Sequence, residues 1–159
     1  MIVLDTHVWL WWISNPELLS AAARKTLDHA MAGGEIGISS ISAWEVAILV
    51  KRGRLDLTMP TEDWIARSEA LRFLRFVPVD NRIGLKSASL PGQLHEDPAD
   101  RIIIATTISL GGTLITKNER SGSINTCGRP GSGTDIRFEQ TRVSSSSGTT
   151  QMRERPRGS

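Results

Sequence analysis

The order of apolar segments predicts an α/β fold with a central, mostly parallel sheet of four to five strands. Short apolar runs of strand length alternate with longer stretches of helical character, a pattern typical of βα units. The chain opens on one such run, Ile2–Leu4, whose continuous apolar character suits a strand buried on both faces. With 159 residues, of which 39% are hydrophobic, the chain is long enough for one domain with its own core.

Local signals place the elements along the first 120 residues. Pro16 suits the first turn of a helix. The alanine-rich stretch 20–32 ends at two glycines, which is typical of a helix C-terminus. We therefore expect strands at Ile2–Leu4, 35–40, 75–79 and 113–116, and helices at 6–13, 20–32, 42–53, 61–73, 81–90 and 97–111.

The C-terminal segment differs in composition from the rest of the chain. Residues 1–120 are predicted to form the α/β domain, whereas 121–159 are rich in Gly, Ser, Thr and Arg and predict a disordered tail with a weak edge strand at 135–138. The first part carries 13 Lys and Arg against 14 Asp and Glu, and the tail carries 6 against 3. The basic balance therefore belongs to the tail and gives little support for a polyanionic partner. A frameshift or recombined end would explain so sharp a break.

Composition also narrows the cellular setting. No stretch approaches the roughly 18 apolar residues of a membrane span. The N-terminus lacks the basic region of a signal peptide. The single cysteine, Cys127, rules out an intrachain disulfide and fits a reducing compartment. We therefore expect a cytoplasmic protein with no membrane partner.

Two acidic residues stand at positions that allow either a structural or a functional role. Asp5 directly follows the first strand, at the sheet edge where open α/β folds bind ligands. The same position suits a helix N-cap, and for Asp5 alone the two interpretations are evenly balanced. Glu45 completes the pattern Ser42-Ala43-Trp44-Glu45, a capping box that by itself favours a structural role about two to one.

Further polar residues lie at the start of the last predicted helix and after the last strand. Asp97 suits an N-cap, Pro98 the first helical position and Asp100 an acidic first turn, so capping explains each locally. Asn118 follows the fourth strand, at a position that we equate with Asp5 on the first strand. It too suits an N-cap.

Taken together, these residues favour a metal site at one edge of the sheet. Converging carboxylates repel one another and stay ionised together only beside a cation. Oxygen ligands without a Cys or His cluster select Mg²⁺ or Mn²⁺. Such a metal can activate water for attack on a phosphodiester. His7 and His95 lack metal-type spacing, so we assign both to structural roles.

Four tryptophans lie near these acids in the sequence. Aromatic side chains can stack nucleic-acid bases, but a tryptophan cluster more often belongs to a core or a partner surface. The residues are Trp9, Trp11, Trp12 and Trp44.

Four segments carry a family resemblance. They are LDTHVWL at 4–10, SSISAWEVA at 39–47, DPADRIIIA at 97–105 and LITKNER at 114–120. In this order and at this spacing they resemble the PIN-domain family, specifically VapC-type toxins of toxin–antitoxin modules, over about residues 1–120. The resemblance implies a three-layer α/β/α sandwich and a Mg²⁺-dependent ribonuclease that cleaves single-stranded RNA. It also implies a homodimer that is inhibited by a small antitoxin.

The resemblance also assigns roles to individual residues. Asp5, Glu45 and Asp100 take the acidic, catalytic metal-site positions, and Asp97 and Asn118 are further candidate ligands. The family usually has aspartate where this chain has Asn118, which removes one negative charge and weakens the expected affinity for metal. The family's closing helix and apolar strand have no clear equivalent after residue 120.

Two other functions remain open on the sequence alone. A catalytically weakened PIN-like protein could act by binding antitoxin or RNA, an interpretation that Asn118 and the tail favour. A phosphatase that uses Asp5 as its nucleophile generally needs a second acid two residues later. That position is His7 in this chain, which counts against this function. No general base is identified. Arg101 and Lys117 are candidates for positioning phosphate, and Arg101 could equally pair with a nearby acid.

Overall fold

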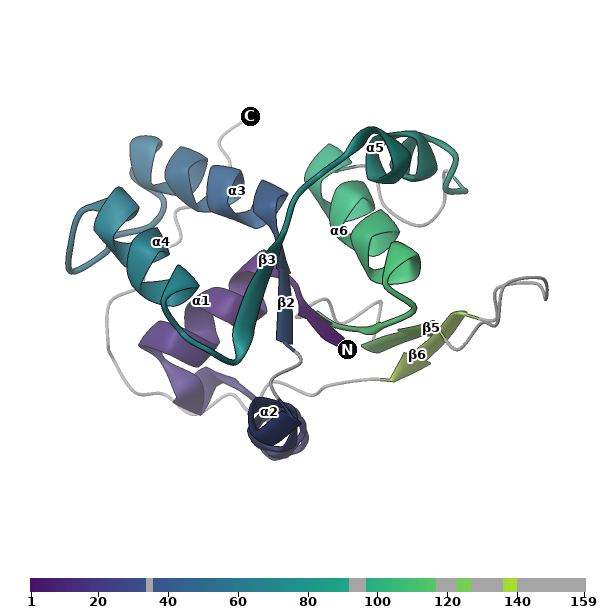
Figure 1. Cartoon of the computed structure of the whole chain (residues 1–159). Helices are drawn as coiled ribbons and strands as arrows, with labels where there is room; N and C mark the ends of the chain where they lie inside the picture. The colour runs from purple at the N-terminus through teal and green to yellow at the C-terminus, as the bar shows by residue number, and fades with distance from the viewer. Residues whose placement is uncertain (34–35, 92–96, 117–122, 127–135, 140–159) are drawn as a thin grey trace.

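The computed structural model describes residues 1–33, 36–91, 97–116, 123–126 and 136–139 of the chain. Its centre is one sheet with the strand order β3-β2-β1-β4-β5-β6 (Figure 1). The parallel strands are β1 (Ile2–Leu4), β2 (Ile36–Ser39), β3 (Leu74–Val77) and β4 (Thr113–Ile115), with β5 (Ser123–Thr126) and β6 (Ile136–Glu139) added antiparallel. This confirms the predicted α/β class and the mostly parallel sheet.

Six α-helices and one short 3₁₀ helix connect the strands in the described part of the chain. They are α1 (Thr6–Ser14), the 3₁₀ helix η1 (Pro16–Leu18), α2 (Ala21–Gly33), α3 (Ser40–Lys51), α4 (Thr61–Glu69), α5 (Asn81–Ala88) and α6 (Pro98–Ser109). All six predicted helices exist, but α4 ends four residues before the predicted bound. After α4 the amide of Leu71 donates to Ser68, which forms a turn that leads directly into β3.

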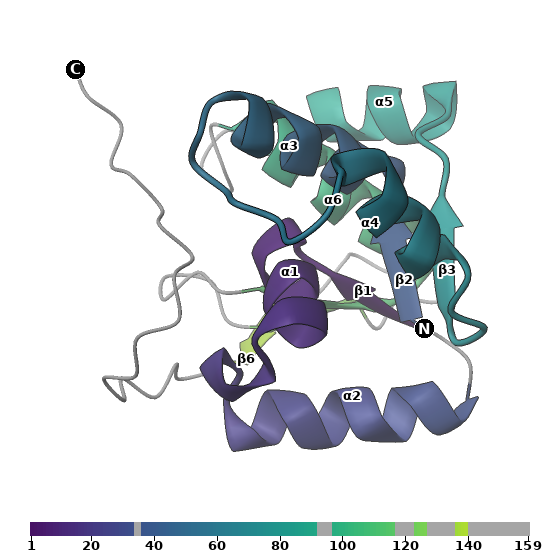
Figure 2. The same cartoon turned by 90° about the vertical axis from the view of Figure 1, so that its left-hand side faces the viewer.

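The helices form two layers, one on each face of the sheet (Figures 1 and 2). Side chains alternate between these faces along each strand. In β1, Leu4 packs with Trp9 of α1 and Trp64 of α4, whereas Val3 packs with Ile103 and Ile104 of α6. The result is the three-layer α/β/α sandwich that the family resemblance implied.

The order of strand addition reverses between β1 and β4, which are parallel. β2 and β3 follow β1 on one side, and β4 then returns to its other side. Leu4 pairs in register with Ile115, so Asp5 and Thr116 emerge side by side at the carboxyl ends of the two strands. In open α/β folds such a switch point opens a crevice for ligands.

The C-terminal segment contributes two short strands to the sheet. The edge strand predicted at 135–138 corresponds to β6, and β5 precedes it. The rest of 121–159 lies outside the described residues, so the domain boundary at 120 and the disordered tail stay predictions. None of the helices that the structure describes is long and apolar enough to cross a membrane.

Candidate functional site

Asp5 begins the site at the switch point of the sheet. It stands at the N-cap of α1 in an extended conformation, but its side chain makes no capping hydrogen bond. Instead, its Oδ2 accepts a hydrogen bond of 2.9 Å from the hydroxyl of Thr116, which follows β4. The capping interpretation therefore does not account for this carboxylate, which joins the ends of β1 and β4.

Glu45 belongs to the same site, and the capping box predicted around it is wrong. Helix α3 starts at Ser40 with Ser39 as its N-cap, so Ser42 lies inside the helix. Ser42 is fully buried, and its hydroxyl has no hydrogen-bond partner among the described residues. The box fails because core packing of this helix face, rather than capping, fixes the place of Ser42.

The side chain of Glu45 instead reaches across to α1. Its Oε2 accepts a hydrogen bond of 2.6 Å from the hydroxyl of Thr6, a residue that is only 1% exposed. The same surroundings raise the pKa of Glu45 from 4.5 to about 7, mainly through burial and with further contributions from the charges of Asp5, Asp100 and Asp97, against the lowering effect of the Thr6 bond. The charges of Asp5, Asp100 and Asp97 therefore all act on Glu45.

The N-terminus of α6 supplies two of these acids. Asp97 caps the helix, because its Oδ1 accepts a hydrogen bond of 2.8 Å from the amide of Ala99. Asp100 lies in the first turn of the helix. The capping role predicted for Asp97 is confirmed, while Asp100 is placed where its charge acts on Glu45.

Arg101 follows these acids, and its guanidinium binds backbone carbonyls. Its guanidinium donates to the carbonyls of Ser87 at 3.0 Å, Pro91 at 3.3 Å and Leu90. The side chain thereby ties the end of α5, and the residues after it, to the start of α6. The sequence had predicted that Arg101 positions phosphate or pairs with a nearby acid. These bonds to backbone carbonyls were not predicted, because the carbonyls lie at least ten residues away in sequence.

Two threonines complete the site, and our sequence reasoning missed both. Thr6 and Thr116 each bind one carboxylate oxygen of the site. The strand register shows that Thr116, rather than Asn118, is the counterpart of Asp5. Asn118, Lys117 and His95 lie outside the described residues. In the sequence, the only signal for these two residues was that a threonine lies within two residues of the end of β1 and of the end of β4.

The tryptophans and His7 differ in their burial and contacts. Trp9 is completely buried and packs on Trp64 and Phe76, so it is a core residue. His7 packs edge-on against Trp11, which agrees with a structural role. Trp44 differs, because 56% of its surface is exposed.

The chemistry of the site fits a hard divalent cation in part. Carboxylate oxygens are the ligands that Mg²⁺ prefers, and this ion commonly uses only one or two of them and retains several waters. Among the described residues, the groups that shift the pKa of Glu45 include three acids and no basic side chain. No three Asp, Glu, His or Cys side chains of the described part converge closely enough to enclose a metal by themselves. The arrangement thus suits an open site completed by water and substrate.

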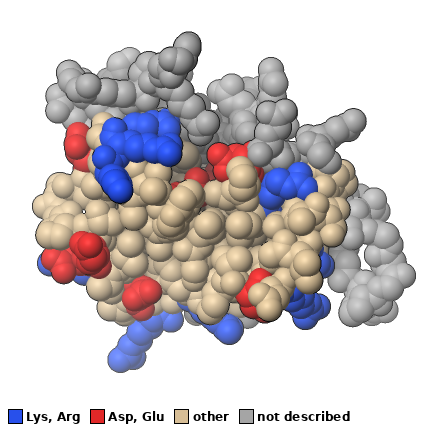
Figure 3. Space-filling model, turned by 90° about the horizontal axis from the view of Figure 1, so that it is seen from above, with Lys and Arg blue, Asp and Glu red and all other residues tan. Residues whose placement is uncertain are grey.

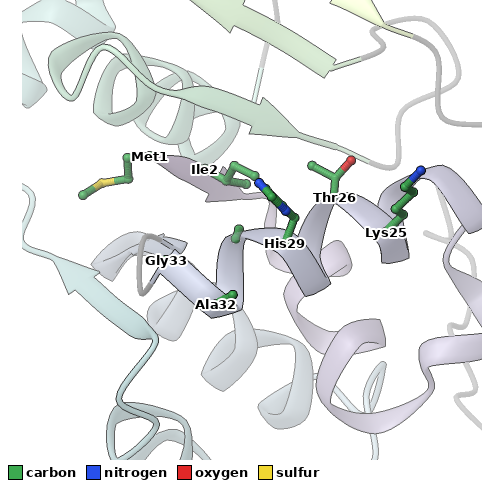
Figure 4. A pocket seen from close by; sticks show the side chains of 8 residues that line it. Met1, Ile2, Lys25, Thr26, His29, Ala32 and Gly33 are labelled. Atoms are coloured by element: carbon green, nitrogen blue, oxygen red, sulfur yellow. The ribbon is translucent and has the colours of Figure 1, made fainter.

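Acidic and basic side chains are both present on the face of the molecule that is seen from above (Figure 3). Some acidic side chains lie near the middle of this face, between basic ones, and others lie toward its rim. A cavity of about 580 Å³ lies elsewhere, between the start of β1 and α2, and is lined by residues such as Ile2, Lys25 and His29 (Figure 4). It contains none of the four acids, so the candidate site is the carboxyl edge of the sheet.

Comparisons with known proteins agree with this geometry. Residues 2–125 match the PIN domain family. The chain is 34% identical over 119 residues to Ribonuclease VapC22 of Mycobacterium tuberculosis, which covers 75% of this chain and 88% of that protein. A toxin–antitoxin complex from Klebsiella pneumoniae has a similar fold, with a TM-score of 0.52 and 22% identity over 82% of this chain and 94% of the other. The chain therefore belongs to the PIN-domain family.

Proposed function

We propose that this protein is a Mg²⁺- or Mn²⁺-dependent endoribonuclease that cleaves single-stranded RNA and acts as the toxin of a toxin–antitoxin module. The observation that carries the proposal is the hydrogen bond from Thr6 to Glu45, which brings this partly buried carboxylate to the residue that follows Asp5. The charges of Asp5, Asp97 and Asp100 all act on this carboxylate. Like charges held close together disfavour ionisation, and such an arrangement suits a site that binds a cation. The relative named a ribonuclease supports the choice of RNA as substrate.

The residues of the site have different roles in this proposal. A bound Mg²⁺ or Mn²⁺ would supply an activated water and neutralise charge on the phosphate. Asp5, Glu45 and Asp100 would hold the cation together with water and substrate, and Asn118 would be a further ligand. Thr6 and Thr116 orient Glu45 and Asp5 by fixing one oxygen of each carboxylate. Asp97 holds the start of α6, and so Asp100, in place through its cap.

The partners follow from the same proposal. We expect a small antitoxin protein to bind and inhibit the enzyme, which the similarity to a toxin–antitoxin complex supports at the level of the fold. We also expect a homodimer in the cytoplasm, where RNA and antitoxin are both present. Copurification of the chain with its antitoxin, followed by measurement of the mass of the complex, would test the partner and the stoichiometry together.

RNA cleavage by the purified full chain tests the activity. We expect a labelled single-stranded RNA to be cut with Mg²⁺ or Mn²⁺ and to stay intact with EDTA. Asp5→Asn should abolish cleavage, whereas Asp28→Asn, which changes an exposed acid on α2, should not. Cleavage that survives Asp5→Asn, or that proceeds fully in EDTA, would contradict the proposed site.

A catalytically weakened protein that binds antitoxin or RNA is the second candidate, and Asn118 is the feature that favours it. Restoring a charge by Asn118→Asp distinguishes the two functions. If the wild-type chain is inert with both metals and Asn118→Asp cleaves RNA, the weakened form is correct. If both cleave, and the variant needs less metal, the enzyme is active and Asn118 only lowers its affinity for the cation.

A further inference from the structure

Trp44 directly precedes Glu45 of the acidic site and is largely exposed. It exposes 56% of its surface, whereas Trp9 and Trp64 expose 0% and 5%. Exposing an indole forgoes the burial that normally stabilises this side chain. Its neighbour in sequence is Glu45, at the centre of the acidic group. A bare aromatic ring next to a catalytic carboxylate is suited to contact with a ligand rather than with the core.

The geometry of α3 relates Trp44 to the site. Ser42 and Val46 are fully buried and define the inner face of the helix. At about 100° per residue, Trp44 points almost directly away from that face and Glu45 lies on the flank beside it. Arg52 follows Glu45 by seven residues, so it lies on nearly the same flank two turns, or about 10 Å, further along.

Basic side chains lie at the C-terminal end of α3, where Lys51 and Arg52 are both exposed. The flank of α3 therefore carries Glu45 near the middle of the helix and the exposed cation of Arg52 at its C-terminal end, with the indole of Trp44 at its rim. Single-stranded nucleic acid needs these two kinds of contact, an aromatic platform for a base and a cation for the backbone.

We propose that the outer flank of α3 is the path along which single-stranded RNA reaches the acidic site. This inference rests on the proposed ribonuclease function. Trp44 stacks on a base next to the phosphate held near Glu45, and Arg52 contacts a phosphate further along the strand. Stacking is tolerant of sequence because every base offers a π face, so these contacts set affinity and register more than sequence preference.

Binding and cleavage by single variants test the path. Trp44→Ala should weaken binding of a fluorescein-labelled, mixed-sequence 12-nucleotide RNA about tenfold and raise KM similarly, with kcat little changed, whereas Trp44→Phe should retain most of the affinity. Arg52→Ala should lower the slope of log affinity against log salt by about 0.7. Met31→Ala and Arg24→Ala remove exposed side chains from α2, on the other side of the molecule, and serve as matched controls (Figure 2).

Binding is measured by fluorescence anisotropy in EDTA, so this test does not depend on turnover. If the wild type binds RNA but fails to cleave it, the proposed function fails while the path is still tested. If the wild type cleaves RNA and Trp44→Ala and Arg52→Ala behave like the α2 controls, the path is wrong and the function stands. A change of oligomeric state in Trp44→Ala, with RNA affinity intact, would instead assign this face to a protein interface and overturn the inference.

Discussion

Neutralising Glu45 should stabilise the metal-free protein above pH 7 while removing its activity. In Glu45→Gln the side chain keeps nearly the same shape and an oxygen that can accept the hydrogen bond from Thr6. What it loses is a charge that burial and three neighbouring acids disfavour. The variant therefore separates the cost of the charge from the packing of the residue.

The size of the effect follows from the raised pKa. Moving the pKa of Glu45 from 4.5 to about 7 corresponds to about 3 kcal/mol. Because the carboxyl is partly exposed to solvent, we expect about 1 to 2 kcal/mol in practice. Between pH 4.5 and about 7 the unfolded chain has released this proton and the folded chain still holds it, so the stability of the wild type falls as pH rises through this window.

Chemical unfolding in EDTA, monitored by tryptophan fluorescence, measures this difference. At about pH 8 the variant should be more stable than the wild type by about 1 to 2 kcal/mol, and near pH 4.5 the two should converge. Added Mg²⁺ should stabilise the wild type more than the variant, because a ligand stabilises the state that binds it. Equal stabilities at pH 8, or a less stable variant, would refute the claim that Glu45 is held at an electrostatic cost.

The remaining predictions concern the framework of the site and can be checked by the same unfolding assay. Gly112→Ala should cost about 1 to 3 kcal/mol, because the new Cβ would lie 2.7 Å from the backbone oxygen of Met1; Gly84→Ala on α5 meets nothing within 4 Å and should instead stabilise by about 1 kcal/mol. Asp97→Ala should cost about 1 kcal/mol through loss of the cap, and Asp97→Asn much less. Thr106→Val should cost about 1 to 2 kcal/mol, because it deprives the buried hydroxyl of Ser39 of its partner.

Some elements of the fold were predicted correctly from signals within a few residues of sequence. The apolar run Ile2–Leu4 fixes both the first strand and the place of Asp5 at its end. Asp97 and Pro98 fix the start of α6, because a cap and a proline act on the adjacent backbone. These predictions succeed because cause and effect lie within one turn of the chain.

Other local signals misled because packing overrode them. The serine and glutamate at 42 and 45 match a capping box, yet the core side of α3 buries Ser42, and Ser39 is the N-cap residue. The hydroxyl of Ser39 does not cap the helix either, since it bonds Thr106 of α6 at 3.1 Å. A four-residue sequence pattern such as a capping box does not show which residues of a distant helix will pack against it.

The sequence by itself determined the class of fold and the strand end that carries Asp5, and it predicted which acids share a site. Only the tertiary structure decided which hydroxyl orients which carboxylate. The bond from Thr6 to Glu45 spans 39 residues of sequence, and that from Thr116 to Asp5 spans 111. Contacts at such separations exist only after β1, β4 and α3 have packed, because parallel strands bring distant segments to one edge. The same packing buries Glu45 among the other acids, and so creates the electrostatic cost that a bound cation would relieve.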